Sequence, residues 1–244
     1  MADSFLVEFR LRGYARKYAE WAAARIGRKA KSLGIREVSG HRFVSHITLF
    51  GGARTDNWKW LANDVERIGQ KFTLVPLKIR GISNFDNRTK QIIYLDVDPS
   101  PELEELRWEL AQRLTKISFE YAPWDTTRRY EFHSTVGIFQ PTSDGKFRQL
   151  RDFAESQCSL EAFKRQEMSF FVRLFRSLMR RRDLDAGVSQ HLLRITVLRR
   201  SRIHCEYDLL CKKQLSRREA LNKYRWRKTI EKLRDLQNIK RQKP

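Results

Sequence analysis

The sequence has few cysteines and no long apolar run, and both absences narrow the class of protein. Its three cysteines include no Cys-x-x-Cys pair, which argues against a disulfide framework and against a structural zinc site. Apolar stretches such as residues 21–24 and 92–95 fall far short of the roughly 20 residues that a membrane-spanning helix needs. The first residues contain no cationic leader followed by an apolar stretch, so no secretory signal is expected. These absences predict a cytoplasmic protein without a membrane segment.

Acidic residues are also scarce relative to basic ones. Fifty Lys and Arg stand against 29 Asp and Glu in 244 residues, which gives a formal net charge of +21. Such a one-sided excess attracts polyanions, whereas thermophile-type surfaces usually mix both signs in ion-pair networks. Hydrophobic residues make up an ordinary 41%, so the charge does not indicate disorder. Nucleic acid is therefore the expected partner class, ahead of an anionic membrane surface.

Strand and helix patterns interleave along the chain. The order predicts an α+β protein with mixed or antiparallel sheets and helices on the outer faces, because two of the strand pairs form hairpins. Gly51-Gly52 is expected to close the second strand. Strands are expected near residues 5–12, 46–50, 74–82, 91–97, 130–139, 192–199 and 203–210, and helices near residues 14–33, 56–70, 101–117 and 146–160.

Two further segments are unusually basic. Residues 163–182, within an insertion at about 163–190, form a predicted amphipathic helix with seven Lys and Arg and one Glu. Residues 212–244 carry 13 Lys and Arg and three acidic residues. We expect residues 1–211 to form one bilobal domain that includes the insertion, and residues 212–244 to form a basic helical tail. Both segments could follow the phosphates of a bound polyanion.

Two short segments share one pattern. His46-Ile47-Thr48-Leu49 and His133-Ser134-Thr135-Val136 each read His-x-Thr-apolar on a predicted strand. Because strand side chains alternate between faces, the His and Thr of each segment point the same way, about 7 Å apart. One such triplet arises easily by chance, but two in matching settings among only five histidines favour a shared site. The others, His41, His191 and His204, are expected at surface or structural positions.

This set of side chains suits phosphodiester chemistry. One imidazole can remove a proton from the attacking hydroxyl or water, while the other donates a proton to the departing oxygen. Histidine suits both tasks because its unperturbed pKa of about 6.5 lets both protonation states coexist near neutrality. The Thr hydroxyls can donate hydrogen bonds to phosphoryl oxygens as charge develops there. Neither a metal ion nor another cofactor is then required.

The paired motifs HITL and HSTV, their separation and the strand–helix order resemble the 2H phosphoesterase superfamily, in particular its LigT-like group of RNA 2',3'-cyclic phosphodiesterases or 2'-5' RNA ligases. The resemblance covers about residues 3–160 and 190–211. It implies a bilobal α+β fold in which two antiparallel sheets line a central cleft. It also implies opening of a 2',3'-cyclic phosphate to a 2'-phosphate, or joining of RNA ends through a 2'-5' linkage. The implied partner is an RNA 3' end, with tRNA or its fragments as one source.

Carried over to this chain, the resemblance makes His133 the group that activates water and His46 the group that protonates the departing 3' oxygen. Which histidine takes which part stays open. Thr48 and Thr135 would hold the phosphate. Many relatives have a basic residue shortly after the second motif, where this chain has Gly137-Ile138-Phe139. The phosphate charge is therefore expected to be met from elsewhere, with Arg54, Arg128 and Arg129 as candidates.

A terminal RNA base could stack on an aromatic ring near these motifs. Phe50 is expected on the same strand face as His46 and Thr48, and Tyr121 and Trp124 lie in the loop before the second motif. Each of these rings could instead fill the core. They are nevertheless the candidate stacking platforms.

Two other functions fit the same fold. One is a non-catalytic RNA-binding module, although such a module would not need proton-transfer groups at both motifs. The other is a phosphodiesterase for a small cyclic nucleotide or an ADP-ribose cyclic phosphate, which the large positive charge disfavours. The sequence does not distinguish hydrolysis from ligation, and it does not establish the oligomeric state.

Overall fold

The computed structural model contains two antiparallel sheets, which confirms the α+β class. It describes residues 3–38, 44–87, 89–167 and 187–242, with side chains described as far as residue 239. The first sheet has the strand order β2-β1-β7-β8-β9 and the second the order β5-β4-β3-β6, with every neighbouring pair antiparallel. The strands are β1 (Asp3–Arg10), β2 (His46–Thr55), β3 (Val75–Asp86), β4 (Gln91–Pro99), β5 (His133–Phe139), β6 (Val188–Leu192), β7 (Arg194–Arg199), β8 (Arg202–Asp208) and β9 (Lys213–Ser216).

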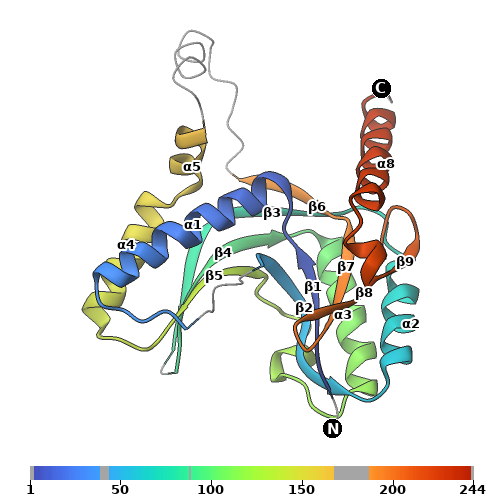
Figure 1. Ribbon diagram of the computed structural model, residues 1–244, viewed down its shortest axis with the longest axis horizontal. Helices are drawn as coiled ribbons and strands as arrows, with labels where there is room; N and C mark the ends of the chain where they lie inside the picture. The colour runs from blue at the N-terminus through green and yellow to red at the C-terminus, as the bar shows by residue number, and fades with distance from the viewer. Residues whose placement is uncertain (1–2, 39–43, 88, 168–186, 243–244) are drawn as a thin grey trace.

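Four helices cover the outer faces, and two of them contact the sheet opposite to the one whose strand precedes them. Helix α1 follows β1 of the first sheet, yet it packs against β5 of the second sheet and against α4. Helix α3 follows β4 of the second sheet and contacts β3 and β4 of that sheet, but it also packs against β2 of the first sheet and against α2. Figure 1 shows α1 and α4 over one sheet and α2 and α3 beside the other. The bounds are α1 (Gly13–Ser32), α2 (Trp58–Gly69), α3 (Pro101–Leu114) and α4 (Asp144–Gln157).

The sequence explains why these helices form and face as they do. In α1 the buried side chains recur every three or four residues, as in Ala15, Tyr18, Ala22 and Ile26, which is the spacing of one helix face. Helix α3 begins at Pro101, and the Ser100 hydroxyl accepts a hydrogen bond from the Leu103 amide at 3.2 Å. The resulting core is continuous across both sheets.

Strand β2 is longer than the sequence predicts. It continues through Gly51-Gly52 to Thr55, so the glycine pair does not end it. A Cβ on Gly51 would lie 2.1 Å from the Leu6 Cδ1 of β1. The glycine at this position therefore permits close packing inside the sheet rather than marking its end.

The C-terminal region also differs from the predicted tail helix. Strand β9 and the short helix α7 (Arg217–Ala220) precede the long helix α8 (Lys223–Gln242), and β9 pairs with β8. Strands β6 and β9 were not predicted because they are only five and four residues long and mostly polar. The division into a domain of residues 1–211 and a tail of residues 212–244 stays a prediction.

Helix α8 projects from the first sheet (Figure 1), and its first turns are anchored there by charged side chains. The Trp226 ring lies between two guanidinium groups, 3.9 Å from that of Arg12 and 3.8 Å from that of Arg194. Arg194 also donates to the Thr229 hydroxyl at 2.7 Å and to the Asp208 carboxylate at 3.0 Å. Cation–π contacts to Trp226 and a hydrogen bond to Thr229 therefore hold this basic helix on the body.

The predicted basic helix of residues 163–182 is described only in part. Its beginning belongs to α5 (Leu160–Glu167), whereas residues 168–186 lie outside the described residues, as does His41. The Phe163 ring packs on Tyr18 and Trp21 of α1, with ring centroids 5.4 and 5.2 Å apart. Within the part of the chain that the structure describes, no helix has both the length and the apolarity needed to cross a bilayer.

Candidate functional site

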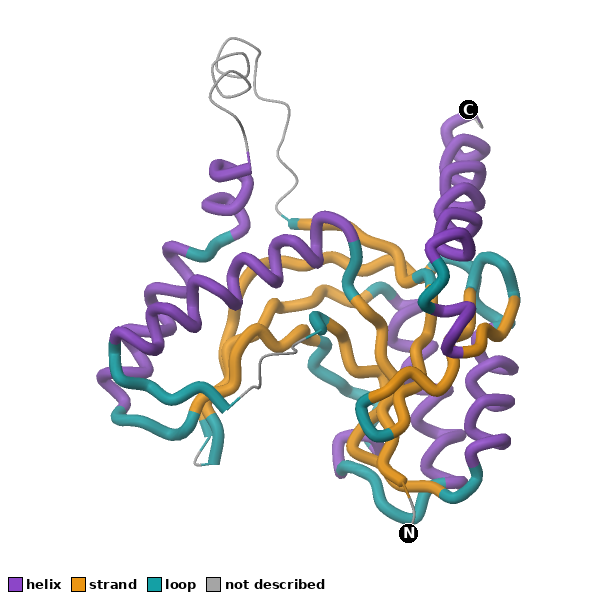
Figure 2. Tube along the Cα trace, viewed as in Figure 1, coloured by secondary structure: helices purple, strands orange, loops and turns teal. Residues whose placement is uncertain are grey.

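The two His-x-Thr segments begin the two edge strands that face each other between the sheets. His46 is the first residue of β2 and His133 the first of β5, and these two strands are in contact. Figure 2 shows the two sheets as the arms of an arch, with both edge strands on its inner side. In each segment the His and Thr are partly exposed, while the residue between them is buried. The alternation predicted for both motifs is therefore confirmed.

Both strands also contain a β-bulge at the same position of the motif. In β2 the additional residue is Leu49, directly after Thr48. In β5 it is Val136, directly after Thr135. Bulges change the direction of neighbouring side chains and are frequent next to active sites. The two lobes thus repeat the same local backbone as well as the same residues.

The bulge in β2 explains why one sequence expectation is wrong. Phe50 was expected to share the exposed face of His46 and to serve as a stacking platform. Because Leu49 is the additional residue, Phe50 pairs with the buried Val7 instead. Its side chain is 0% exposed and stacks on Phe5 with ring centroids 5.7 Å apart. Phe50 therefore belongs to the core.

The two imidazoles are oriented in the same way by the backbone. The Nδ1 of His46 lies 2.7 Å from the Val44 carbonyl oxygen, and the Nδ1 of His133 lies 2.8 Å from the Glu131 carbonyl oxygen. A carbonyl oxygen can only accept, so Nδ1 is assigned as the protonated donor in both rings. Nε2 is then the nitrogen of each ring that is left to accept or donate a further hydrogen bond.

Charged side chains surround His46. The Glu8 Oε2 lies 3.7 Å from its Nδ1, and the Glu8 side chain is almost fully buried. The other carboxylate oxygen of Glu8 accepts a hydrogen bond from the Arg10 Nε at 2.6 Å. Arg10 is the cross-strand partner of His46, and Glu8 is that of Thr48. An arginine and a carboxylate therefore share the sheet face that carries this motif.

Aromatic side chains surround His133 instead. Its ring centroid lies 5.1 Å from that of Phe85 and 5.2 Å from that of Tyr94, and these two rings stack 4.2 Å apart. The Tyr94 hydroxyl donates to the Glu131 carboxylate at 2.6 Å. Burial raises the pKa of Tyr94 to about 12, so this hydroxyl keeps its proton near neutrality.

The aromatic surroundings change the protonation of His133. Burial lowers the pKa of His133 below 6.5, and the backbone carbonyl and the carboxylate of Glu131 oppose this shift. Repulsion from His46 lowers the pKa further. The two rings are therefore close enough to interact electrostatically, although they lie on different sheets.

The loop before β5 is fixed against β2 and presents aromatic rings to solvent. Fully buried Arg107 donates to the carbonyl oxygen of Trp124 at 2.6 Å and to that of Thr127. The Asp125 carboxylate accepts a hydrogen bond from the Gly51 amide of β2 at 3.4 Å. The side chains of Trp124 and Tyr121 are 56% and 40% exposed. Both remain candidate stacking platforms.

The three predicted phosphate-binding arginines are placed differently from one another. Arg54 lies eight positions along β2 from His46, roughly 25 Å by strand rise, and pairs with Glu120 at 3.3 Å. The structure therefore places Arg54 near the opposite end of β2 from His46. Arg128 pairs with Glu105 at 2.8 Å, and Arg129 is exposed. For these two the predicted role stays a prediction.

Four side chains next to the histidines were missed by sequence reasoning. Glu8 and Arg10 follow the alternation of β1, but only the strand register places them beside His46. Phe85 and Tyr94 are ordinary aromatic strand residues, and nothing in the sequence shows their contact with His133. Among the described residues, no group of three or more His, Cys, Asp or Glu is placed to hold a metal ion.

Comparisons with known proteins found similar solved structures. Usb1 of Kluyveromyces marxianus with uridine monophosphate is similar at 13% identity and a TM-score of 0.45, covering 88% of this chain and 97% of that one. TT0787 of Thermus thermophilus is similar at 12% identity and a TM-score of 0.49, covering 86% of this chain and 98% of that one. No curated protein matches the sequence.

The family itself is identified by sequence. Residues 17–164 match the sequence model of the 2'-5' RNA ligase superfamily. This match spans more than half of the chain and includes both His-x-Thr segments. The chain therefore belongs to the 2'-5' RNA ligase superfamily, within the 2H phosphoesterases.

Proposed function

We propose that this protein opens the 2',3'-cyclic phosphate at RNA 3' ends and leaves a 2'-phosphate, without a metal ion. The observation that carries the proposal is the pairing of two His-x-Thr segments on contacting edge strands, with the same bulge after each Thr. The contact between β2 and β5, each of which begins with its histidine, supports the action of both imidazoles on one phosphorus atom. A pair of imidazoles is sufficient for general acid and base catalysis of this reaction.

The surroundings of the two rings favour one division of roles. His133 is the base, because burial lowers its pKa and keeps the ring neutral near pH 7. His46, the other imidazole of the pair, is then the acid, and the buried Glu8 carboxylate lies 3.7 Å from its Nδ1.

The reaction then proceeds as a single in-line displacement. The His133 Nε2 takes a proton from water, and the water oxygen attacks phosphorus. The bond between phosphorus and O3' breaks, and the His46 Nε2 gives its proton to O3', which leaves a 3'-hydroxyl and a 2'-phosphate. If the 5'-hydroxyl of a second RNA replaced water, the same transfer would form a 2'-5' linkage.

The remaining polar side chains of the two motifs hold the phosphate. The hydroxyls of Thr48 and Thr135 donate to its non-bridging oxygens, where charge grows in the transition state. Arg10 supplies the positive charge that many relatives have shortly after the second motif and that this chain lacks there. It can do so because it lies directly across the strand pair from His46. A guanidinium has five N–H donors, and Glu8 accepts from the one at Nε.

The partner class follows from charge and exposed rings. A net charge of +21 favours a polymer over a small cyclic nucleotide. The exposed rings of Trp124 and Tyr121 lie on the loop that is fixed against β2, where a base near the reacting end could stack.

The direct test is to incubate purified protein with RNA that ends in a 2',3'-cyclic phosphate, in EDTA, and to identify the terminus. We expect a 2'-monophosphate in the wild type. We expect a loss of about 10²- to 10⁴-fold in turnover for His46→Ala and for His133→Ala, the usual contribution of a general acid or base.

Binding of the same RNA should persist in both variants, which separates lost chemistry from lost folding. His191→Ala, a change at a histidine of β6 outside the motifs, is the matched control and should retain turnover. Loss of turnover on chelation, or unchanged turnover in either motif variant, would contradict the proposal.

A further inference from the structure

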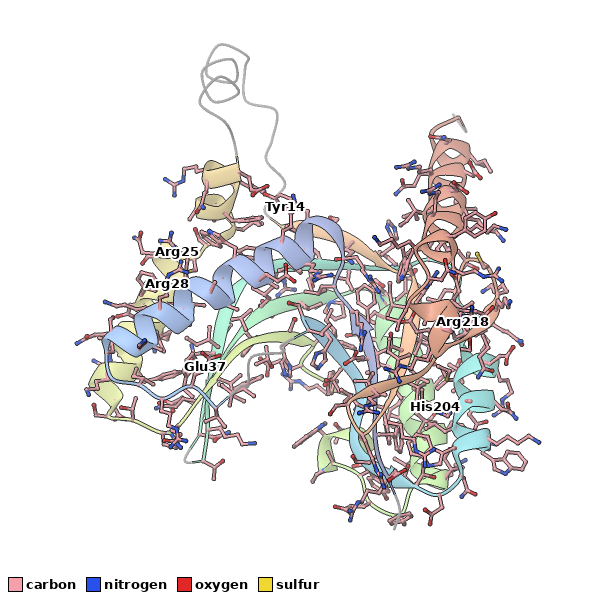
Figure 3. The ribbon with its side chains drawn as sticks, in the orientation of Figure 1. Tyr14, Arg25, Arg28, Glu37, His204 and Arg218 are labelled. Carbon is pink, nitrogen blue, oxygen red and sulfur yellow. The ribbon has the colours of Figure 1, made fainter. Side chains whose placement is uncertain are left out.

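A cavity of about 450 Å³ opens at the end of the first sheet away from His46. Asp3 begins β1, whereas Arg10, the partner of His46, ends it. The cavity therefore lies roughly 23 Å from the histidine by strand rise. Figure 3 shows His204 beside α2 on this side of the molecule. The lining residues are Asp3, Arg199, Arg200, Arg202, Ile203 and His204.

A tight turn between β7 and β8 gathers the three arginines. Arg199 and Arg202 pair across a loop of only two residues. These residues have positive φ angles, 45° at Arg200 and 63° at Ser201, as in the type I′ turn that Asn and Gly usually occupy. Here the turn carries an arginine instead, so three guanidinium groups fall within four positions of the chain.

The orientation of two of these arginines is fixed by their neighbours. The Asp3 carboxylate, 6% exposed, accepts a hydrogen bond from the Arg199 Nε at 2.6 Å and pairs with Arg200 through its other oxygen. The Arg199 guanidinium also lies 4.6 Å over the Trp58 ring. These contacts hold the donors in place before any ligand arrives, which lowers the entropy cost of binding.

The charge of the lining is not balanced. One carboxylate faces three guanidinium groups, and Arg202 forms no ion pair with any residue that the structure describes. His204 is the additional residue of a bulge in β8, and its ring meets Trp58 edge-on at 5.2 Å. An imidazole nitrogen can therefore add a hydrogen bond to those of the arginines.

We propose that this cavity is a second phosphate-binding site, separate from the two histidines. Guanidinium groups bind phosphate through paired hydrogen bonds, and the lining carries two more positive charges than negative ones. The phosphate could belong to the backbone of a bound RNA or to a free phosphate or phosphate ester. The proposal does not depend on the reaction at His46 and His133.

The first experiment uses inorganic phosphate and the His46→Ala/His133→Ala double variant, which lacks the proposed reacting groups. We expect phosphate to shift the His204 ring signals in a ¹⁵N-correlated NMR titration. Arg202→Gln should weaken this binding about tenfold, the effect of losing one hydrogen bond to a charged group. Arg218→Gln, at an exposed arginine of α7 outside the lining (Figure 3), is the matched control and should bind like its parent.

The second experiment distinguishes the source of the phosphate. The affinity of a twelve-nucleotide RNA with a plain 3'-hydroxyl is compared with that of a dinucleotide at several salt concentrations. A backbone phosphate in the cavity predicts that Arg202→Gln weakens only the longer RNA and reduces its salt slope by about 0.7. Unchanged RNA affinity together with phosphate-dependent His204 shifts assigns the cavity to free phosphate. Absence of any His204 shift, or equal phosphate affinity in Arg202→Gln and Arg218→Gln, overturns the proposal.

Discussion

His46 and His133 occupy the same position in matching bulged strands, but the side chains around them belong to different chemical classes. Behind His46 lie a buried carboxylate and an arginine, Glu8 and Arg10. Around His133 lie two stacked aromatic rings, Phe85 and Tyr94. The backbone thus repeats the geometry, while burial lowers the pKa of His133. In this family member, side chains outside the His-x-Thr motif would decide which histidine acts as the acid and which as the base.

The largest effect is expected where the two lobes are alike. Thr48→Val and Thr135→Val keep the β-branched shape but remove a hydroxyl from each motif. Each should lower the rate of cyclic phosphate opening about 10²-fold, as removal of one donor to a developing oxyanion does. Single-turnover kinetics would measure this loss. A large loss in one variant with none in the other would show that the lobes do not share the phosphate.

A change at Arg10 tests the charged side chains around His46 without altering the surroundings of His133. Arg10→Gln should lower kcat/KM about tenfold or more, because a guanidinium opposite His46 can no longer pair with the phosphate. Steady-state kinetics at two salt concentrations would measure this loss, which high salt should lessen. The matched control is Arg16→Gln, at an exposed arginine of α1 that pairs with Glu20. Equal losses in both variants would contradict a specific role of Arg10.

Exchanging a carboxylate for an amide tests the environment of each ring. Glu8→Gln should slow turnover about tenfold, because the Arg10 Nε loses its charged acceptor and its guanidinium is held less firmly across from His46. Glu131→Gln, the corresponding change near His133, should have a smaller effect on turnover, because the Glu131 carbonyl oxygen still accepts from the His133 Nδ1. Equal turnover in Glu8→Gln and the wild type would contradict a positioning role of Glu8.

The smallest effect is expected from loosening the aromatic surroundings. Phe85→Leu exposes His133, so the pKa of His133 should rise toward its usual value. Because the base must be neutral to act, the acid limb of the kcat/KM profile should move to higher pH, while the rate above neutrality changes little. A shift of this limb to lower pH would disagree with burial as the cause.

Much of this arrangement could be predicted from the sequence, and the failures share one cause. The two motif strands, α1 and α3 follow from periodicity and capping, which are local properties. Phe50 was misplaced because a bulge changes strand facing by one residue, and a bulge depends on the partner strand. Glu8 and Arg10 were missed for the same reason, since their proximity to His46 is a matter of register. The contact of Phe85 with His133 depends on pairings across the second sheet.

The strand order of the first sheet has a consequence for how the chain folds. Strand β1 pairs with β7, which follows far along the chain, for example Val7 with Val197. During synthesis the edge of β1 that pairs with β7 would stay uncovered until the chain about 190 positions farther along has left the ribosome. Contacts so distant in sequence make folding slow, and an open strand edge invites aggregation. Shortened chains that end before β7 should therefore depend on chaperones, even though both histidines are already present in them.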